Sequence, residues 1–371
     1  MTNRVSVGLR ALALAATAAL IAFGVAACGT TSNSTSTTSG SSSSSQSGTI
    51  GLLLPETKTT RYEAFDHPYI QQDLKKLCPD CKFLYANADQ DAGQQQTQAE
   101  SMLTQGVDVM ILDPVDGKAA EAIVNKAQSQ GVPVVSYDRL ANGPVSDYVG
   151  FDTKQVGQLQ GKALLSALKA NGTQNSGDVV MINGAPTDPN AAGFKAGAHS
   201  VLDGQVTIGK EYDTPDWSAD KAQSEMQGAI AALGKDKIVG VYSANDGMAA
   251  GIAAALKSAG YNPFPPLTGQ DAQVDGIQRI VAGQQSMTIY KPIAPEAQTA
   301  AQMAVDLLRG DTYKTTETTN NGTKDVPSKI LTPIAVTQKN IKDTVIKDGF
   351  LTVKDICTPQ YAADCKKAGL D

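Results

Sequence analysis

The 371-residue chain has only two histidines, a single tryptophan and 5% aromatic residues, and its net charge is −6. The two histidines, His67 and His199, lie far apart in the sequence, which argues against a His-based zinc site or a Ser-His-Asp triad. An acidic chain without a basic stripe is a poor partner for nucleic acid. Phosphate-binding motifs of the type G-x-x-x-x-G-K-[ST], or G-x-G-x-x-G after a strand, are also missing. We therefore expect no metal, no cofactor and no nucleic-acid partner.

The composition that is present is globular, with 41% hydrophobic residues, 18% charged residues and 34 glycines. These values exclude a mainly disordered chain, a collagen and a coiled coil. Since aromatic residues are few, the core must consist largely of Ala, Val, Ile and Leu. At roughly 100–200 residues per domain, the length suggests about two domains.

The N-terminus has the features of an export signal. Two arginines flank the start of an apolar stretch, residues 11–23, that is too short to span a bilayer comfortably. The stretch leads into Val25-Ala26-Ala27-Cys28, which resembles the lipobox of bacterial lipoproteins, whose cysteine is lipidated. We predict a signal peptide at residues 1–27 and lipidation at Cys28. The alternative is an ordinary signal peptide or anchor in which Cys28 is incidental.

A flexible tether is predicted next, at residues 28–48. This segment is nearly all Ser, Thr and Gly after the cysteine, so it cannot bury enough apolar surface to fold. Twenty such residues have a reach of about 25 Å. No later apolar run is long enough to cross a membrane. We expect an extracytoplasmic body that a lipid anchor holds at the outer face of the cell membrane.

Four further cysteines remain, Cys78, Cys81, Cys357 and Cys365. An even number in an exported chain suggests disulfides. The first two form a C-x-x-C motif, but it follows a predicted helix and precedes a predicted strand, the reverse of the order that a redox motif needs. We favour two local bridges, Cys78–Cys81 and Cys357–Cys365, with cross-pairing or free thiols as the alternatives.

From Thr49 onward, short continuous apolar runs alternate with amphipathic ones, a pattern typical of parallel strands covered on both faces by helices. The first half predicts strands at 50–54, 83–86, 107–112, 132–136 and 148–151, and helices at 69–77, 92–103 and 118–128. The second half predicts strands at 179–182, 206–212, 238–242, 267–269 and 287–290, and helices at 219–233, 247–259, 274–282 and 295–308. Two such sets imply an α/β protein with two doubly wound parallel-sheet domains.

Polar and aromatic side chains follow most of these strands, where ligands of such sheets bind. They include Lys58, Arg61, Tyr62, Asp113, Asp138, Arg139, Asn190, Trp217, Asn245, Asp271 and Lys291. Each alone is an ordinary cap or turn residue. Together they suit a neutral polyol, because each sugar hydroxyl both donates and accepts hydrogen bonds and planar charged groups strengthen those bonds. Trp217 and Tyr62 could supply an apolar platform for the sugar, with ordinary packing as the alternative.

Five stretches carry a family resemblance. They are Tyr137-Asp138-Arg139, residues 183–191, residues 243–246, residues 268–272 and residues 287–292. In this order, within a region from about Thr49 to Arg309, they resemble periplasmic-type sugar-binding proteins of the ribose/galactose/xylose class, and most closely the D-xylose-binding proteins. Such proteins are the receptors of ABC importers and perform no chemistry on the sugar.

The resemblance implies a type I periplasmic-binding-protein fold, in which a hinge of three crossings joins two lobes. The crossings would lie near residues 150–152, 290–292 and 330–333. The N-terminal lobe would then comprise residues 49–150 plus 292–330, and the C-terminal lobe residues 151–291 plus 331–371. A monomer of this kind closes on a monosaccharide, and membrane permease subunits read the closed form.

The resemblance also implies roles for individual residues. Arg61 and Tyr62 would lie near the ligand, Arg139 and Asp271 would hold its oxygens, and Trp217 would stack on the ring. The complete set of candidate ligand residues is Lys58, Arg61, Tyr62, Asp138, Arg139, Asn190, Trp217, Asn245, Asp271 and Lys291. Tyr62 stands where xylose-type proteins usually have Trp. The ligand is therefore D-xylose or, as the alternative, another aldose or polyol such as glucose, ribose, galactose or inositol.

Rival functions fit less well. A glycosidase needs an acid and a nucleophile about 5–10 Å apart; Asp138 and Asp271 could be considered, but Arg139 and Lys291 would keep both ionised and leave no acid. A transcription regulator on the same body would need a helix-turn-helix where this chain has its predicted signal and tether. A receptor that reports to a sensor protein remains an alternative to transport.

Overall fold

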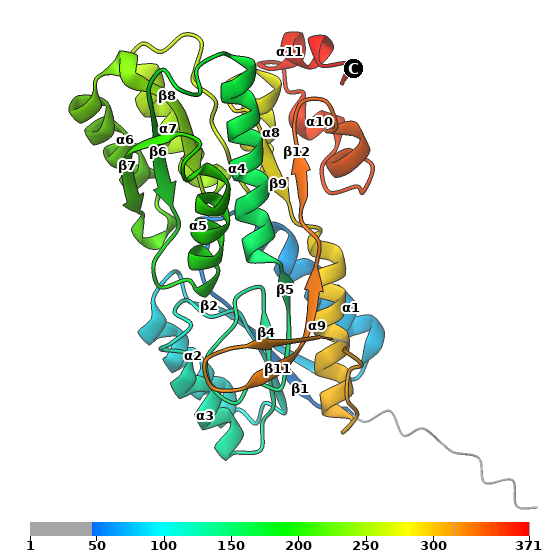
Figure 1. The fold of residues 1–371 in the computed structure, drawn as a ribbon. Helices are drawn as coiled ribbons and strands as arrows, with labels where there is room; N and C mark the ends of the chain where they lie inside the picture. Colours follow the sequence, from blue (N-terminus) through cyan, green and yellow to red (C-terminus); the bar gives the residue numbers. More distant parts are fainter. Residues whose placement is uncertain (1–46, 316, 371) are drawn as a thin grey trace, which may run out of the picture. The chain divides into compact units, whose positions relative to one another are not determined.

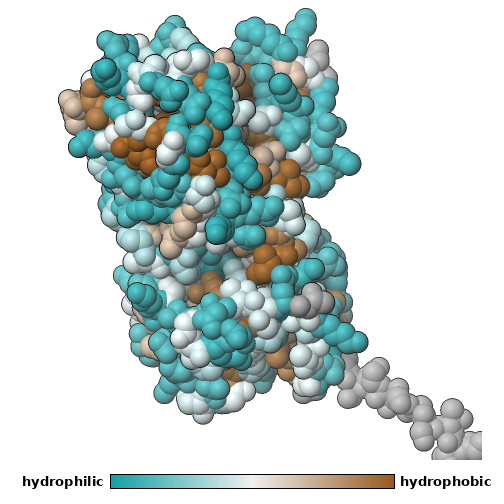
Figure 2. Space-filling model, viewed as in Figure 1, coloured by the Kyte–Doolittle hydropathy of each residue, from teal (hydrophilic) through white to brown (hydrophobic). Residues whose placement is uncertain are grey.

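The structure is a computed structural model that describes residues 47–315 and 317–370. The predicted signal peptide, nearly all of the tether and Cys28 lie outside the described residues. Residues from Thr49 onward form two α/β lobes (Figure 1). Within the described ranges, no helix combines the length and the apolar character needed to cross a bilayer. The face of the molecule in Figure 2 is mainly hydrophilic, with hydrophobic residues in several separate groups.

The N-terminal lobe is built on a seven-stranded sheet in the order β10-β11-β5-β4-β3-β1-β2. Its strands are β1 (Thr49–Leu54), β2 (Lys82–Asn87), β3 (Val109–Leu112), β4 (Val134–Tyr137), β5 (Asp147–Phe151), β10 (Glu317–Asn320) and β11 (Asp325–Leu331). Its helices are α1 (His67–Leu77), α2 (Ala92–Thr104), α3 (Glu121–Ser129) and α9 (Ile293–Leu308). All neighbours are parallel except β10 and β11.

The continuous apolar run of β1 reflects helices on both faces of this sheet. Ile50 and Leu52 pack in the cluster with α1 and α9, whereas Leu53 packs in the cluster with α2 and α3. All three side chains are fully buried. Successive side chains of a strand point to opposite faces, so a strand buried on both sides must be apolar throughout.

The C-terminal lobe has a three-stranded parallel sheet in the order β7-β6-β8 and an antiparallel pair, β12-β9. Its strands are β6 (Asp178–Asn183), β7 (Thr207–Asp213), β8 (Ile238–Ser243), β9 (Thr288–Tyr290) and β12 (Ile334–Val336). Its main helices are α4 (Thr153–Ala170), α5 (Pro189–Leu202), α6 (Ala219–Leu233), α7 (Asp246–Ser258) and α8 (Val274–Val281).

The prediction of a regular strand at 267–269 is wrong. Leu267 forms only an isolated parallel bridge to Val241. On its other side, the Leu267 carbonyl accepts a hydrogen bond of 2.8 Å from the Ser286 amide. The segment therefore lies between β8 and β9 and links them, but it is too short for a ladder. The sequence also did not predict α4, α5 or the β10–β11 hairpin.

The doubly wound α/β fold is confirmed. Three segments of the chain join its two lobes. One runs from β5, which ends at Phe151, into α4, and another from β9, which ends at Tyr290, into α9. The third runs from β11, which ends at Leu331, into β12. After β12, the chain packs on the C-terminal lobe and forms the short helices α10 (Val353–Ile356) and α11 (Ala362–Lys367). The structure pairs Cys78 with Cys81 and Cys357 with Cys365.

Candidate functional site

A small cavity lies where the two lobes meet. The empty space among its lining side chains, including space open to solvent, is about 260 Å³. The N-terminal lobe lines it with Thr59, Tyr62, Asp138 and Arg139, and the other lobe and the second crossing line it with Asp188, Asn190, Phe194, Trp217, Asn245, Gln270, Asp271 and Lys291.

The polar residues reach the cavity because they follow strands. Asp138 and Arg139 come directly after β4, and Lys291 comes directly after β9. Asn245 follows β8 and caps α7, where its side chain accepts a 2.9 Å hydrogen bond from the Met248 amide. Asp138 and Asn245 thus lie just beyond the carboxyl ends of parallel strands, one in each lobe, where ligands of such sheets bind.

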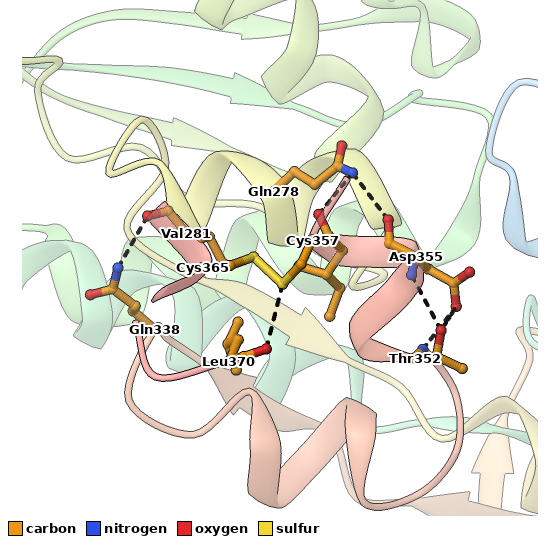
Figure 3. The surroundings of a disulfide bond; sticks show 9 residues. Gln278, Val281, Gln338, Thr352, Asp355, Cys357, Cys365 and Leu370 are labelled. Atoms are coloured by element: carbon orange, nitrogen blue, oxygen red, sulfur yellow. Dashed lines mark hydrogen bonds between the residues drawn. A yellow bond between two sulfur atoms is a disulfide. The ribbon is translucent and has the colours of Figure 1, made fainter. Parts of the chain in front are cut away.

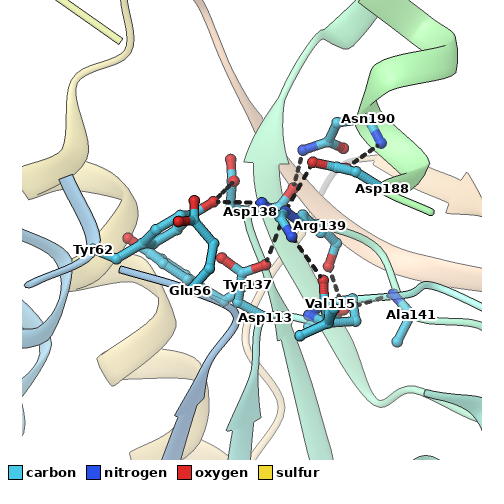
Figure 4. Close-up of polar contacts among 12 residues, drawn as sticks. Glu56, Tyr62, Asp113, Val115, Tyr137, Asp138, Arg139, Ala141, Asp188 and Asn190 are labelled. Atoms are coloured by element: carbon cyan, nitrogen blue, oxygen red, sulfur yellow. Dashed lines mark hydrogen bonds and ion pairs between the residues drawn. The ribbon is translucent and has the colours of Figure 1, made fainter. Parts of the chain in front are cut away.

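Arg139 joins the lobes through Asp188, as Figure 4 shows. Its Nε lies 2.9 Å from Asp188 Oδ2, and its Nη2 donates a 3.2 Å hydrogen bond to the Tyr62 hydroxyl. Burial raises the pKa of Asp188, while Arg139 opposes that shift. Behind the guanidinium, Asp113 lies 3.7 Å from Arg139 Nε, and burial raises its pKa well above the usual range. The ion pair of Arg139 and Asp188 therefore connects the two lobes at the cavity wall.

Asp138 is held as a charged acceptor. Its carboxylate accepts hydrogen bonds of 3.3 Å from Arg61 Nη1 and from the Tyr62 hydroxyl, and lies 3.6 Å from Lys291 Nζ. Burial alone would raise the pKa of Asp138, but Arg61, Lys291 and Arg139 outweigh burial and hold it well below the usual range. Its main-chain carbonyl accepts a 3.1 Å bond from Asn190 Nδ2, a second contact between the lobes.

Lys291 completes the charged part of the cavity wall. Its ammonium lies 3.1 Å from Asp271 Oδ1, and it is only 5% exposed. Burial lowers the pKa of Lys291, yet Asp138 and Asp271 outweigh burial and leave it raised, so the side chain stays a cation. Nearby, Gln270 Oε1 is a buried acceptor without a hydrogen-bond partner within the described ranges. An added hydroxyl group could supply the missing donor.

Trp217 forms an apolar wall. It lies in a single helical turn, Pro215–Trp217, and is 5% exposed. Its indole Nε1 donates a 3.1 Å hydrogen bond to Asp188, and its ring meets Phe194 edge to face at 6.4 Å. A Cβ at Gly184 would lie 2.0 Å from the indole, so only glycine permits this placement. The flat ring suits the C–H face of a sugar.

The structure brings eight of the ten predicted ligand residues to the cavity wall. These are Tyr62, Asp138, Arg139, Asn190, Trp217, Asn245, Asp271 and Lys291. Lys58 is not among them, because its side chain is exposed on the first loop. Arg61 lies behind the wall, with its guanidinium 2.6 Å from Asp66 and 2.8 Å from Glu296. Arg61, which we predicted to be a ligand residue, therefore does not line the cavity but supports Asp138.

Four lining residues escaped the prediction, namely Thr59, Asp188, Phe194 and Gln270. Asp188 and Gln270 lie inside stretches that carried the family resemblance, so a signal for them existed. Each stands beside a stronger candidate, Asn190 or Asp271. Thr59 and Phe194 have no such signal, because a loop threonine and a helix phenylalanine are ordinary in those positions.

The arrangement can bind, and each carboxyl group that lines the cavity has a cationic partner. A retaining or inverting glycosidase needs one protonated carboxyl group beside the sugar. Arg61, Lys291 and Arg139 hold Asp138 ionised. Burial raises the pKa of Asp188, but its carboxyl group is engaged by Arg139 and by the indole of Trp217. Among residues 47–315 and 317–370, no group of His, Cys, Asp and Glu has an arrangement that would hold a metal ion. Charged acceptors, charged donors, amides and one indole around a small cavity together suit a neutral polyhydroxylated molecule.

Comparisons with known proteins agree with this geometry. Residues 50–312 match the periplasmic binding protein domain. The chain is 38% identical to the D-xylose-binding periplasmic protein of Escherichia coli (strain K12) over 307 residues, which cover 81% of this chain and 90% of the relative. It is 34% identical to the D-xylose-binding periplasmic protein of Haemophilus influenzae over 313 residues, or 83% of this chain and 91% of the relative.

A solved structure shares the fold as well. The ABC transporter solute binding protein of Clostridium phytofermentans, crystallised with bound β-D-glucose, superposes with a TM-score of 0.76 at 26% identity. The match covers 83% of this chain and 99% of that protein. The family match, the identity to curated relatives and the shared fold lead to one conclusion: the chain belongs to the periplasmic binding protein family.

Proposed function

We propose that the protein is the extracytoplasmic receptor of an ABC sugar importer and that it binds D-xylose in the cavity between its lobes. The observation that carries this proposal is a cavity that both lobes line with charged and amide groups and with Trp217. The protein is a binding receptor and not an enzyme, in keeping with its family. Two curated relatives above 30% identity bind D-xylose according to their names, which favours xylose.

Binding would proceed by closure of the hinge. Sugar contacts come from both lobes, so the ligand favours the closed arrangement by its differential affinity for that state. Asp138 and Asp271 would accept hydrogen bonds from sugar hydroxyls, and Arg139 and Lys291 would donate to sugar oxygens. Trp217 would cover one face of the ring. The closed form would then be read by the permease, and a report to a sensor protein is the alternative readout.

The proposed cellular setting follows from the N-terminus. We propose that Cys28 carries a lipid, that residues 28–48 tether the body to the outer face of the membrane, and that the receptor acts as a monomer. Growth in labelled palmitate tests the lipid: the wild-type chain should take up label and Cys28→Ser should not. Equal labelling of both would contradict the anchor and leave the sugar site untouched.

The sugar is tested by titration calorimetry of the full-length protein against D-xylose, D-glucose, D-ribose, L-arabinose, D-galactose and myo-inositol. We expect D-xylose to bind most tightly. Asp271→Asn should weaken binding about tenfold or more, since it removes a charged acceptor. The matched control is Asp216→Asn. Asp216 is next to Trp217 in the chain, but its carboxylate pairs with the exposed Lys221. Tighter binding of glucose would favour the alternative aldose, and no binding of any sugar by folded protein would contradict the proposal.

A further inference from the structure

The C-terminal segment brings an aromatic ring to the N-terminal lobe. Phe350 follows the last crossing, yet its ring centroid lies 4.3 Å from that of Phe65 at an angle of 31°. Phe65 belongs to the short helical turn Tyr62–Asp66, which directly follows the first loop of the N-terminal lobe. The ring of Phe350 also lies 5.1 Å from Tyr290, at the end of β9. This contact therefore spans the two lobes near the second crossing.

The segment that carries Phe350 is fixed to the C-terminal lobe. Val345, Phe350 and Ile356 are buried against the apolar face of α8. Gln278 of that helix donates hydrogen bonds of 3.1 and 3.2 Å to the carbonyls of Asp355 and Ile356. Figure 3 shows these bonds beside the disulfide between Cys357 and Cys365, which joins the chain just after α10 to α11. A short covalent loop thus closes soon after Phe350 in the chain, within the same apolar cluster.

The contact lies beside the sugar cavity. A groove opens between the lobes, and both Phe65 and Phe350 line it. Asp271 lines this groove as well as the sugar cavity, and Arg61 lies on its wall. Movement of the lobes that opens the cavity on this side would therefore change the distance between the two rings.

We propose that Phe65 and Phe350 are positioning residues that stabilise the closed arrangement and so strengthen sugar binding without touching the sugar. This inference rests on the proposed function of closure around a sugar. The affinity that a ligand shows is reduced by the fraction of protein in the competent state, so a contact made only on closure strengthens binding. We call the contact between Phe65 and Phe350 the latch. On this proposal, the disulfide-bonded C-terminal segment holds Phe350 in place for it.

A double-mutant cycle tests the latch. Phe65→Leu, Phe350→Leu and the double variant are titrated with D-xylose as full-length proteins. Aromatic pairs of this geometry are coupled by an amount that corresponds to about 2- to 10-fold in affinity. We expect each single variant to bind more weakly by about this factor, and the double variant to bind no more weakly than the weaker single one. Phe65→Leu leaves the tail intact, so it reports even if Phe350→Leu loosens the tail.

Matched controls separate closure from simple packing. Tyr361→Leu alters the same aromatic and apolar cluster within the tail, and should lower the melting temperature without changing the affinity. Cys357→Ser with Cys365→Ser should weaken binding, whereas Cys78→Ser with Cys81→Ser should not. The radius of gyration from X-ray scattering without sugar gives a readout that does not depend on the ligand, and it should rise in Phe65→Leu and Phe350→Leu.

The outcomes are distinguishable. Two results would overturn the latch and leave the proposed function standing, provided that the wild-type protein binds sugar. One is a loss of affinity in the double variant equal to the sum of the losses in the two single variants. The other is no loss of affinity in either single variant together with an unchanged radius of gyration. Failure of the wild-type protein to bind any sugar would overturn the proposed function. In that case an unchanged radius of gyration in both variants would overturn the latch too, and an increase would support it.

Discussion

The two lobes hold their parts of the cleft by different means. In the N-terminal lobe, Asp138 belongs to a buried network of ion pairs. Its partner Arg61 also forms ion pairs with Asp66 and Glu296. In the C-terminal lobe, Asp188 and Asn245 are the N-caps of α5 and α7, so the helix ends position them. The loss of one partner from a buried ion network costs several kcal/mol, whereas an N-cap contributes about 1 kcal/mol. Changes in the first lobe should therefore affect folding, and changes in the second should affect binding.

The largest effect should follow from Arg61→Met. The change removes the cation that Asp66, Asp138 and Glu296 share. Asp138 keeps Lys291, but Asp66 and Glu296 lose the cation with which they form an ion pair. We expect the free energy of unfolding, measured with urea, to fall by about 3–5 kcal/mol. Arg309→Met is the control, because its guanidinium donates one exposed hydrogen bond to the Leu77 carbonyl. A loss below about 1 kcal/mol in Arg61→Met would mean that the network is not the support of this lobe.

Gly184→Ala should act mainly on binding. The new methyl group would lie 2.0 Å from the indole of Trp217 and would displace that wall of the cavity. Overpacking costs about 1–3 kcal/mol, which corresponds to roughly 5- to 150-fold in sugar affinity if the cost falls on the closed cavity. Gly228→Ala is the matched control, since its nearest neighbour would be the Tyr212 hydroxyl at 3.9 Å. Unchanged affinity in Gly184→Ala would show that Trp217 is not part of the binding surface.

The fold could be predicted largely because the sheets are covered on both faces. Leu52 and Leu53 point into different cores, and this forces the continuous apolar run that marks β1. The β10–β11 hairpin lacked that signal: β10 is Glu-Thr-Thr-Asn at the sheet edge and is mostly exposed. The segment at Leu267 had the composition of a strand, but its pairing is limited to one bridge.

The candidate site was predictable by position and less so by orientation. Tyr62 and Arg61 are adjacent, and nothing local decides which of them faces the cavity. In the structure the helical turn directs Tyr62 to the cavity and Arg61 toward Asp66 and Glu296, partners that stand elsewhere in the sequence. Asp188 is the N-cap of α5, and its second oxygen also meets Arg139 and Trp217. Long-range pairs of this kind leave no local signal.

Asp188→Asn should have a smaller effect on binding than Gly184→Ala. Asparagine is as good an N-cap as aspartate, so α5 and the melting temperature should be nearly unchanged. The variant loses the charge that faces Arg139 across the cleft, which removes a charge-assisted contact between the lobes. We expect D-xylose to bind about 3- to 10-fold more weakly by calorimetry. Asp91→Asn, at the equivalent cap of α2, is the control. A large loss of stability in Asp188→Asn would contradict the division of roles between the lobes.

The smallest effect concerns pH and the surface of the C-terminal lobe. His199 contacts Asp203 at 2.8 Å and Glu211 at 2.9 Å. Burial lowers the pKa of His199, but hydrogen bonds to Glu211 and Asp203 outweigh burial and leave it raised. Because the folded-state pKa lies above the unfolded value of about 6.5, the stabilisation is fully present below that pH and is lost as pH rises through the folded pKa. The site is partly exposed, so solvent screening should keep the gain below about 1 kcal/mol. Urea unfolding of wild type and His199→Gln from pH 5 to 9 should show a difference at the acidic end that fades as the histidine deprotonates. A difference that grew with rising pH would reverse the sign of this linkage. Sugar affinity should be the same in both proteins across this range, since Asp138 stays ionised and Lys291 stays protonated.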